Sequence, residues 1–86
     1  EIEVVKGNRL EGIGEGVDLI VAKIYAEVLL ELLDQLNNHL TKDGKVILSG
    51  IVSEKLEIVK GKARDVGLRV LKEQEEENWY ALLLTR

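Results

Sequence analysis

The segment from Val17 to Leu32 most strongly restricts the fold, because an apolar run passes directly into a helical pattern. Val17 to Ala22 has the composition of a strand that is buried on both faces of a parallel sheet. From about Tyr25 to Leu40, apolar residues recur at helical spacing and predict a helix with one apolar face. A buried strand followed at once by a helix indicates a crossover connection, so the sequence predicts an α/β fold.

The rest of the chain adds further strands and a second helix. One short strand is predicted before Val17 and another after the first helix, where Lys42-Asp43-Gly44 is predicted to be the turn between helix and strand. A second helix is expected to begin at Ser53 as its N-cap and to end at Gly67 as its C-cap. Two more strands, joined by Glu75 to Asn78, are predicted to form an antiparallel hairpin. The four strands span Ile2 to Val5, Lys45 to Ser49, Leu68 to about Gln74, and Trp79 to Thr85.

Composition excludes several classes of function. The chain has 86 residues, 33% of them charged, with a formal net charge of -4. This length predicts a single domain over residues 1–86. The negative charge disfavours partners that need a basic face, so we expect neither nucleic acid nor a membrane surface. There is no cysteine, and His39 is the only histidine. Thiolate chemistry is therefore excluded, and a multi-histidine metal site is not expected.

Several residue types are missing altogether. The chain contains no proline, cysteine, methionine or phenylalanine, and aromatic residues make up 3% of it. A core built almost entirely from Leu, Ile, Val and Ala is typical of designed sequences. We therefore interpret the chain as an engineered or excised sequence.

Three features have the chemistry of a functional site. Gly12 to Gly16 resembles a nucleotide-binding loop, but it precedes a strand rather than opening a helix, which favours a connector. Lys23 could be an activated amine, although its place at the end of a strand favours a solvated side chain. His39 could be a general base, but its polar surroundings favour a surface histidine.

The predicted hairpin carries two more candidates. Glu75, Glu76 and Glu77 could bind a hard cation, but consecutive residues of a hairpin point in different directions, which favours a solvated turn. Trp79 and Tyr80 should lie on opposite faces of the sheet, so that at most one of them is in the core. We therefore assign no catalytic, cofactor-binding or metal-binding residue.

Five strings together resemble the catalytic domain of the bacterial ribosomal protein L11 methyltransferases, which are class I S-adenosylmethionine-dependent enzymes. They include Ala26-Glu27-Val28-Leu29-Leu30-Glu31-Leu32, Leu48-Ser49-Gly50-Ile51 and Trp79-Tyr80-Ala81-Leu82-Leu83-Leu84. The resemblance covers nearly the whole chain and corresponds to the second half of that domain. It implies a Rossmann-like half-domain with a mostly parallel twisted sheet of about five strands, two helices and a C-terminal antiparallel hairpin. The strands beginning at Val17, Lys45, Trp79 and Leu68 should lie in that order.

The resemblance also implies a specific difference in the cofactor site. In the family, the strand matching Val17 to Ala22 ends in a Val-Ala-Asn-Ile pattern whose asparagine helps to hold S-adenosylmethionine. This chain has Val21-Ala22-Lys23-Ile24, and a lysine lacks the acceptor of the amide. The family's glycine-rich cofactor loop has no counterpart among these residues, so we expect no cofactor.

Two functional hypotheses follow. The first is a stand-alone α/β scaffold, derived from or engineered on a methyltransferase half-domain, which is not itself an enzyme. The alternative is a fragment of an S-adenosylmethionine-dependent ribosomal protein methyltransferase that is active only with the N-terminal half. In either case we expect a cytoplasmic location and a homodimer formed through an exposed strand edge or by strand exchange. The strand at Ile2 could pair beside Val17 to Ala22, pair elsewhere or exchange with a second copy.

Overall fold

The computed structural model describes residues 2–6, 16–23, 30 and 33–86. Residues 30 and 33–36 are helical. The other elements are the strands β1 (Ile2–Lys6), β2 (Val17–Lys23), β3 (Leu40–Val52), β4 (Arg69–Glu76) and β5 (Trp79–Thr85), the 3-10 helices η1 (Asn37–His39) and η2 (Ser53–Lys55), and the helix α2 (Leu56–Asp65). The predicted α/β class is confirmed.

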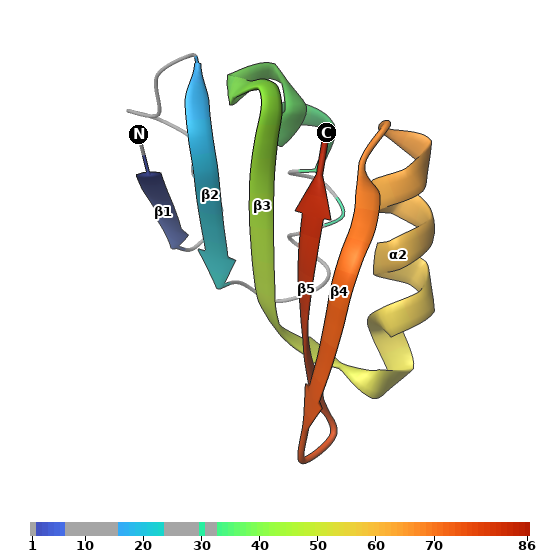
Figure 1. The fold of residues 1–86 in the computed structure, drawn as a ribbon. Coiled ribbons are helices and arrows are strands. Elements are labelled where there is room, and N and C mark those ends of the chain that lie inside the picture. Colours follow the sequence, from blue (N-terminus) through green and yellow to red (C-terminus); the bar gives the residue numbers. More distant parts are fainter. Residues whose placement is uncertain (1, 7–15, 24–29, 31–32) are drawn as a thin grey trace.

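The strands form one sheet in the order β1-β2-β3-β5-β4 (Figure 1). β1, β2 and β3 run parallel, whereas β5 is antiparallel to both β3 and β4. The predicted order of the last four strands is confirmed, and β1 lies beside β2 of the same chain. The sheet is mixed rather than mostly parallel, because the C-terminal hairpin contributes two of the four strand pairings.

The hydrophobic core lies on one side of the sheet. Alternate residues of the central strands point into it, as the two-residue period of a strand requires. Leu33 and Leu36 of the first helical segment and three residues of α2 belong to the same buried cluster, so both helices cover this side. We call this side the helix face. Its fully buried strand residues include Ile20, Ala22, Val46, Leu48, Ile51, Leu82 and Leu84.

The second helix forms largely as its sequence pattern predicts. Leu56, Val59 and Ala63 are buried, and Val66 packs against the core. Gly67 ends the helix with a φ of 90°. Its amide donates to the carbonyl of Arg64 at 3.0 Å, and the amide of Leu68 donates to the carbonyl of Ala63 at 2.9 Å. This pair of hydrogen bonds is a Schellman motif, which confirms Gly67 as the C-terminal stop.

The predicted role of Ser53 is wrong. No side chain caps η2 or α2, and the Ser53 hydroxyl instead donates to Glu54 Oε1 at 2.6 Å. The amide of Ser53 donates to the carbonyl of Asn78 at 3.2 Å, which ties this connection to the hairpin turn. That turn is shorter than predicted, because β4 extends to Glu76 and only Glu77 and Asn78 connect the strands. Both have a positive φ, 48° and 69°, as a two-residue type I′ turn requires.

The third strand is longer than predicted and contains two irregularities. Val17 pairs with Leu40 and Leu19 with Lys45, so Lys42-Asp43-Gly44 lies in a bulge of β3 rather than in a separate turn. Arg86 fixes this bulge, because its amide donates to the Gly44 carbonyl at 3.0 Å and its Nη1 donates to the Leu40 carbonyl at 2.9 Å. The helix predicted over residues 25–40 therefore ends early: residues 33–36 are helical, η1 follows, and Leu40 begins the strand. The first part of that helix, and Gly12 to Glu15, lie outside the described residues.

Candidate functional site

The carboxyl ends of the parallel strands form the candidate site. Ligands of open α/β sheets bind outside this edge. The last residue of β2, Lys23, pairs with Lys6 of β1 on one side and with Ser49 of β3 on the other. Three neighbouring strands therefore place two lysines and a serine in one row across the sheet.

Lys23 lies where the resemblance places the cofactor-contacting asparagine. It is exposed, which agrees with the interpretation of a solvated amine at a strand end. An ammonium group donates hydrogen bonds but accepts none, so Lys23 can contact carboxylates, hydroxyls and carbonyls of a ligand only as a donor. The resemblance gives this residue the position of the family's asparagine, whereas the chemistry of the lysine differs from that of the amide.

Gly50 shapes the neighbouring end of β3. Its φ is 79°, and the pairing of β3 with β5 shifts register between Leu48 and Ile51. The bulge inserts one residue into the alternation, so that Leu48 and Ile51 are both fully buried although they are three residues apart. Ser49 remains half-buried at the edge. The sequence contains this glycine, but the bulge depends on the pairing with β5, which the local pattern does not reveal.

The side of the sheet away from the helices forms a second feature, which we call the open face. Alternation places Val21, Ile47 and Leu83 on it, and these three are consecutive cross-strand partners. They are half-buried, as are Leu19 and Ala81. A shallow depression of about 160 Å³ lies here, lined by Ile47, Lys72, Gln74, Ala81, Leu82 and Leu83. In the part of the chain that the structure describes, the buried helical side chains all belong to the opposite side.

The acidic hairpin is not arranged as a metal site. Glu75 pairs with Tyr80 and Glu76 with Trp79, which places their side chains on opposite faces of the sheet. No group of three acidic, histidine or cysteine side chains converges among the described residues. Trp79 is 48% exposed, whereas Tyr80 packs against the core, so the expected division of the two aromatic residues is confirmed. Desolvation, together with the charge and hydrogen bond of Glu75, raises the pKa of Tyr80 above its ordinary value of 10.0.

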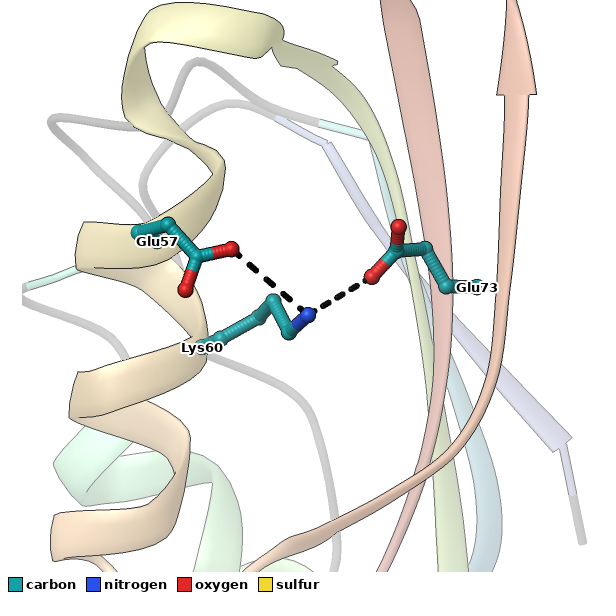
Figure 2. Close-up of polar contacts among 3 residues, drawn as sticks. All are labelled: Glu57, Lys60 and Glu73. Carbon is teal, nitrogen blue, oxygen red and sulfur yellow. Dashed lines mark hydrogen bonds and ion pairs between the residues drawn. The ribbon is translucent and has the colours of Figure 1, made fainter.

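A polar cluster joins α2 to β4 on the helix face. Figure 2 shows Lys60 Nζ between Glu73 Oε1 at 2.7 Å and Glu57 Oε2 at 3.6 Å. The hydrogen bond that Lys60 donates to Glu73, together with the charge of Glu57, raises the pKa of Lys60 above 10.5 despite its desolvation. Lys60 thus contacts one carboxylate of its own helix and one of β4, and the pair with Glu73 holds the helix against the hairpin.

The remaining candidates lie away from these features. His39 is the last residue of η1 and is half-buried rather than fully on the surface. Gly16, the only described residue of the glycine-rich segment, is exposed and precedes β2 with a φ of 71°. No helix in the described residues is long and apolar enough to cross a bilayer.

Comparison with known proteins adds independent evidence. The family model described as Ribosomal protein L11 methyltransferase (PrmA) matches residues 1–86. The ribosomal protein L11 methyltransferase of Dictyoglomus turgidum is 37% identical over 83 residues, and that of Lactobacillus johnsonii is 40% identical over 85 residues. These matches cover 96% and 99% of this chain but 28% and 27% of the relatives, in their C-terminal part.

Solved structures agree with this result. The crystal structure of a ribosomal protein L11 methylase from Lactobacillus delbrueckii has a TM-score of 0.86 and 34% identity, covering 93% of this chain and 42% of that one. A methyltransferase from Pyrococcus furiosus has a TM-score of 0.69 at 27% identity, with 92% of this chain and 45% of that one covered. The chain therefore spans less than half the length of either protein.

These findings correct two predictions. The interpretation of an engineered scaffold is wrong, because the matching relatives are bacterial proteins that share the pattern along the whole chain. An aromatic-poor composition is thus a property that a natural sequence of this kind can have. The expectation of no cofactor conflicts with the family, which is S-adenosylmethionine-dependent. The chain belongs to the ribosomal protein L11 methyltransferase family.

Proposed function

We propose that this chain forms the C-terminal part of the catalytic domain of an S-adenosylmethionine-dependent enzyme that methylates ribosomal protein L11. The observation that carries the proposal is the family match over residues 1–86, together with strands β2 and β3, whose carboxyl ends form one edge. In this proposal Lys23 and Ser49 form one wall of the cofactor site. The polypeptide that precedes the matched segment in the relatives supplies the other wall, and the chain alone does not complete the reaction.

Within this proposal each residue has a limited role. S-adenosylmethionine supplies the methyl group. The side chain of Lys23 stands beside the cofactor and donates hydrogen bonds to its oxygen atoms. Ser49 offers a hydroxyl that both donates and accepts. Because ribosomal proteins are made in the cytoplasm, we expect the enzyme to act there.

A chimera tests the proposal directly. Residues 1–86 replace the matching C-terminal segment of the Dictyoglomus turgidum relative, and transfer of a labelled methyl group to ribosomal protein L11 is measured. We expect activity above that of the relative truncated before this segment. A folded chimera that transfers no label would contradict the proposal.

Lys23 provides a sharper test in the same chimera. Lys23→Asn restores the donor and acceptor of the family's amide, so we expect KM for S-adenosylmethionine to fall by about ten-fold, equivalent to one good hydrogen bond. Lys45→Asn is the matched control, because Lys45 is also an exposed lysine but lies at the other end of the β2–β3 pairing. An equal effect of both substitutions would exclude a cofactor contact at Lys23.

A further inference from the structure

The edge at the carboxyl ends of β2 and β3 carries a cationic side chain, Lys23, that the described residues do not neutralise. Lys23 is exposed, and among the described residues it has no carboxylate within ion-pair distance and no side-chain hydrogen-bond partner. The ion pairs of the described residues involve Lys60 and Lys62 and lie on the helix face instead. The positive charge of Lys23 therefore acts on whatever ligand lies at this edge.

The same edge offers a hydroxyl group and open space beside Lys23. The carboxyl ends of β2 and β3 lie side by side (Figure 1), where Ser49 is the direct partner of Lys23 and is half-buried. A Cβ added to Gly50, the next residue of β3, would meet no heavy atom within 4 Å. A ligand therefore has room at the end of β3, and both strands present hydrogen-bond donors to it.

These side chains fit one part of the cofactor and conflict with another. S-adenosylmethionine carries a carboxylate and hydroxyl groups, which accept hydrogen bonds from an ammonium group. It also carries a sulfonium, and a nearby ammonium repels this positive charge. S-adenosylhomocysteine, the product of the transfer, has the same carboxylate, amine and hydroxyl groups but a neutral sulfur. The product therefore fits the edge at Lys23 better than the cofactor does.

We propose that Lys23 makes this site discriminate between cofactor and product, in favour of S-adenosylhomocysteine. The inference rests on the proposed function for the identity of the ligand. In methyl transfer the acceptor takes the methyl group and releases a proton, and the electron pair of the broken carbon–sulfur bond stays on the sulfur. The repulsion with Lys23 disappears when the product forms, so the enzyme retains its product. The rate of methylation then depends on the ratio of cofactor to product.

The charge of one side chain sets the size of the effect. Two like unit charges about 4 Å apart in water repel each other enough to weaken binding by about five-fold. The two ligands differ only in the methyl group and the charge that it gives to the sulfur. The ratio of their dissociation constants therefore isolates the interaction between the sulfonium and Lys23, and added salt should reduce it.

Calorimetric titration of the chimera with each ligand tests this proposal without measuring methyl transfer. We expect S-adenosylhomocysteine to bind more tightly than S-adenosylmethionine. Lys23→Gln removes the charge and keeps a polar side chain of similar length, so it should lower the ratio of the two dissociation constants by about five-fold. Lys23→Arg keeps the charge and should keep the ratio.

Lys45→Gln is the matched control, because it removes the same charge at the other end of the β2–β3 pairing and should leave the ratio unchanged. Three results would overturn the inference: a ratio that Lys23→Gln does not change, an equal change with Lys45→Gln, or a change with Lys23→Arg as large as that with Lys23→Gln. In each of these cases both ligands still bind, and the proposed function stands. A folded chimera that binds neither ligand would refute the proposed function together with this inference.

Discussion

Gly61→Ala should stabilise the protein, although glycine at this position is part of the natural sequence. Gly61 lies in the interior of α2, five residues after its start at Leu56. A Cβ added there meets no heavy atom within 4 Å, and the residue has no positive φ. The substitution therefore removes the conformational freedom of glycine in the unfolded chain without any steric cost in the folded one.

The magnitude follows from helix propensity. Glycine is less favourable than alanine in a helix interior by about 0.8–1.0 kcal/mol. For a domain of this size, 1 kcal/mol corresponds to a rise in Tm of about 4–8 °C. Urea denaturation followed by far-UV circular dichroism measures the change, and an unchanged m value ensures that it reflects stability.

Gly44→Ala is the matched control, since it makes the same chemical change where there is no space. A Cβ at Gly44 would lie 2.8 Å from Leu40 Cβ and 3.1 Å from the amide nitrogen of Thr41. Neither atom can move by a side-chain rotation, so we expect a loss of about 1–3 kcal/mol, as for other overpacked sites. Gly61→Ala that lowers the urea midpoint, or Gly44→Ala that leaves it unchanged, would refute this reasoning.

Three further predictions concern stability. The pKa values of Lys60 and Tyr80 are raised, so the folded state binds more protons than the unfolded state above pH 10. The free energy of unfolding should therefore be constant near neutrality and decrease as the pH rises through this range. Lys60→Gln should make this decrease shallower in a series of urea midpoints measured at increasing pH. The hydrogen bond that the Ser53 hydroxyl donates lowers the pKa of Glu54 below 4.5. The stability that this hydrogen bond contributes is therefore present above pH 4.5 and lost as the pH decreases below that value. Ser53→Ala should remove this dependence at acidic pH and leave the decrease at alkaline pH unchanged. Leu48→Ala empties a fully buried position and should cost about 2–5 kcal/mol in the same assay, whereas a loss below about 1 kcal/mol would show that the core repacks around it.

The parts of the fold that the sequence predicts correctly have local causes. The stripe of Leu56, Val59 and Ala63 repeats at helical spacing, and Gly67 stops it, so both the existence and the end of α2 follow from neighbouring residues. The hairpin follows in the same way from two strand-forming segments and the short polar connection between them. The order of the last four strands came from the family resemblance, because alternation alone does not specify which strands pair.

The errors, in contrast, have non-local causes. Thr41 to Gly44 has the composition of a turn, yet Arg86 holds this segment in β3 from 42 and 46 residues away along the chain. Ser53 has the composition of an N-cap, yet its backbone amide already bonds Asn78. In both cases a partner far along the sequence determines the local structure, and no window of neighbouring residues contains that partner.

The candidate site, too, has a part that neighbouring residues predict and a part that they do not. Lys23 could be identified from the sequence because it replaces one residue of a known string. The open face could not, because an apolar run specifies that both sides of a strand are covered without specifying what covers them. The amino-acid composition led to the wrong prediction of an engineered chain for a related reason. A small number of aromatic residues affects how a core packs but does not indicate whether a sequence is natural or designed.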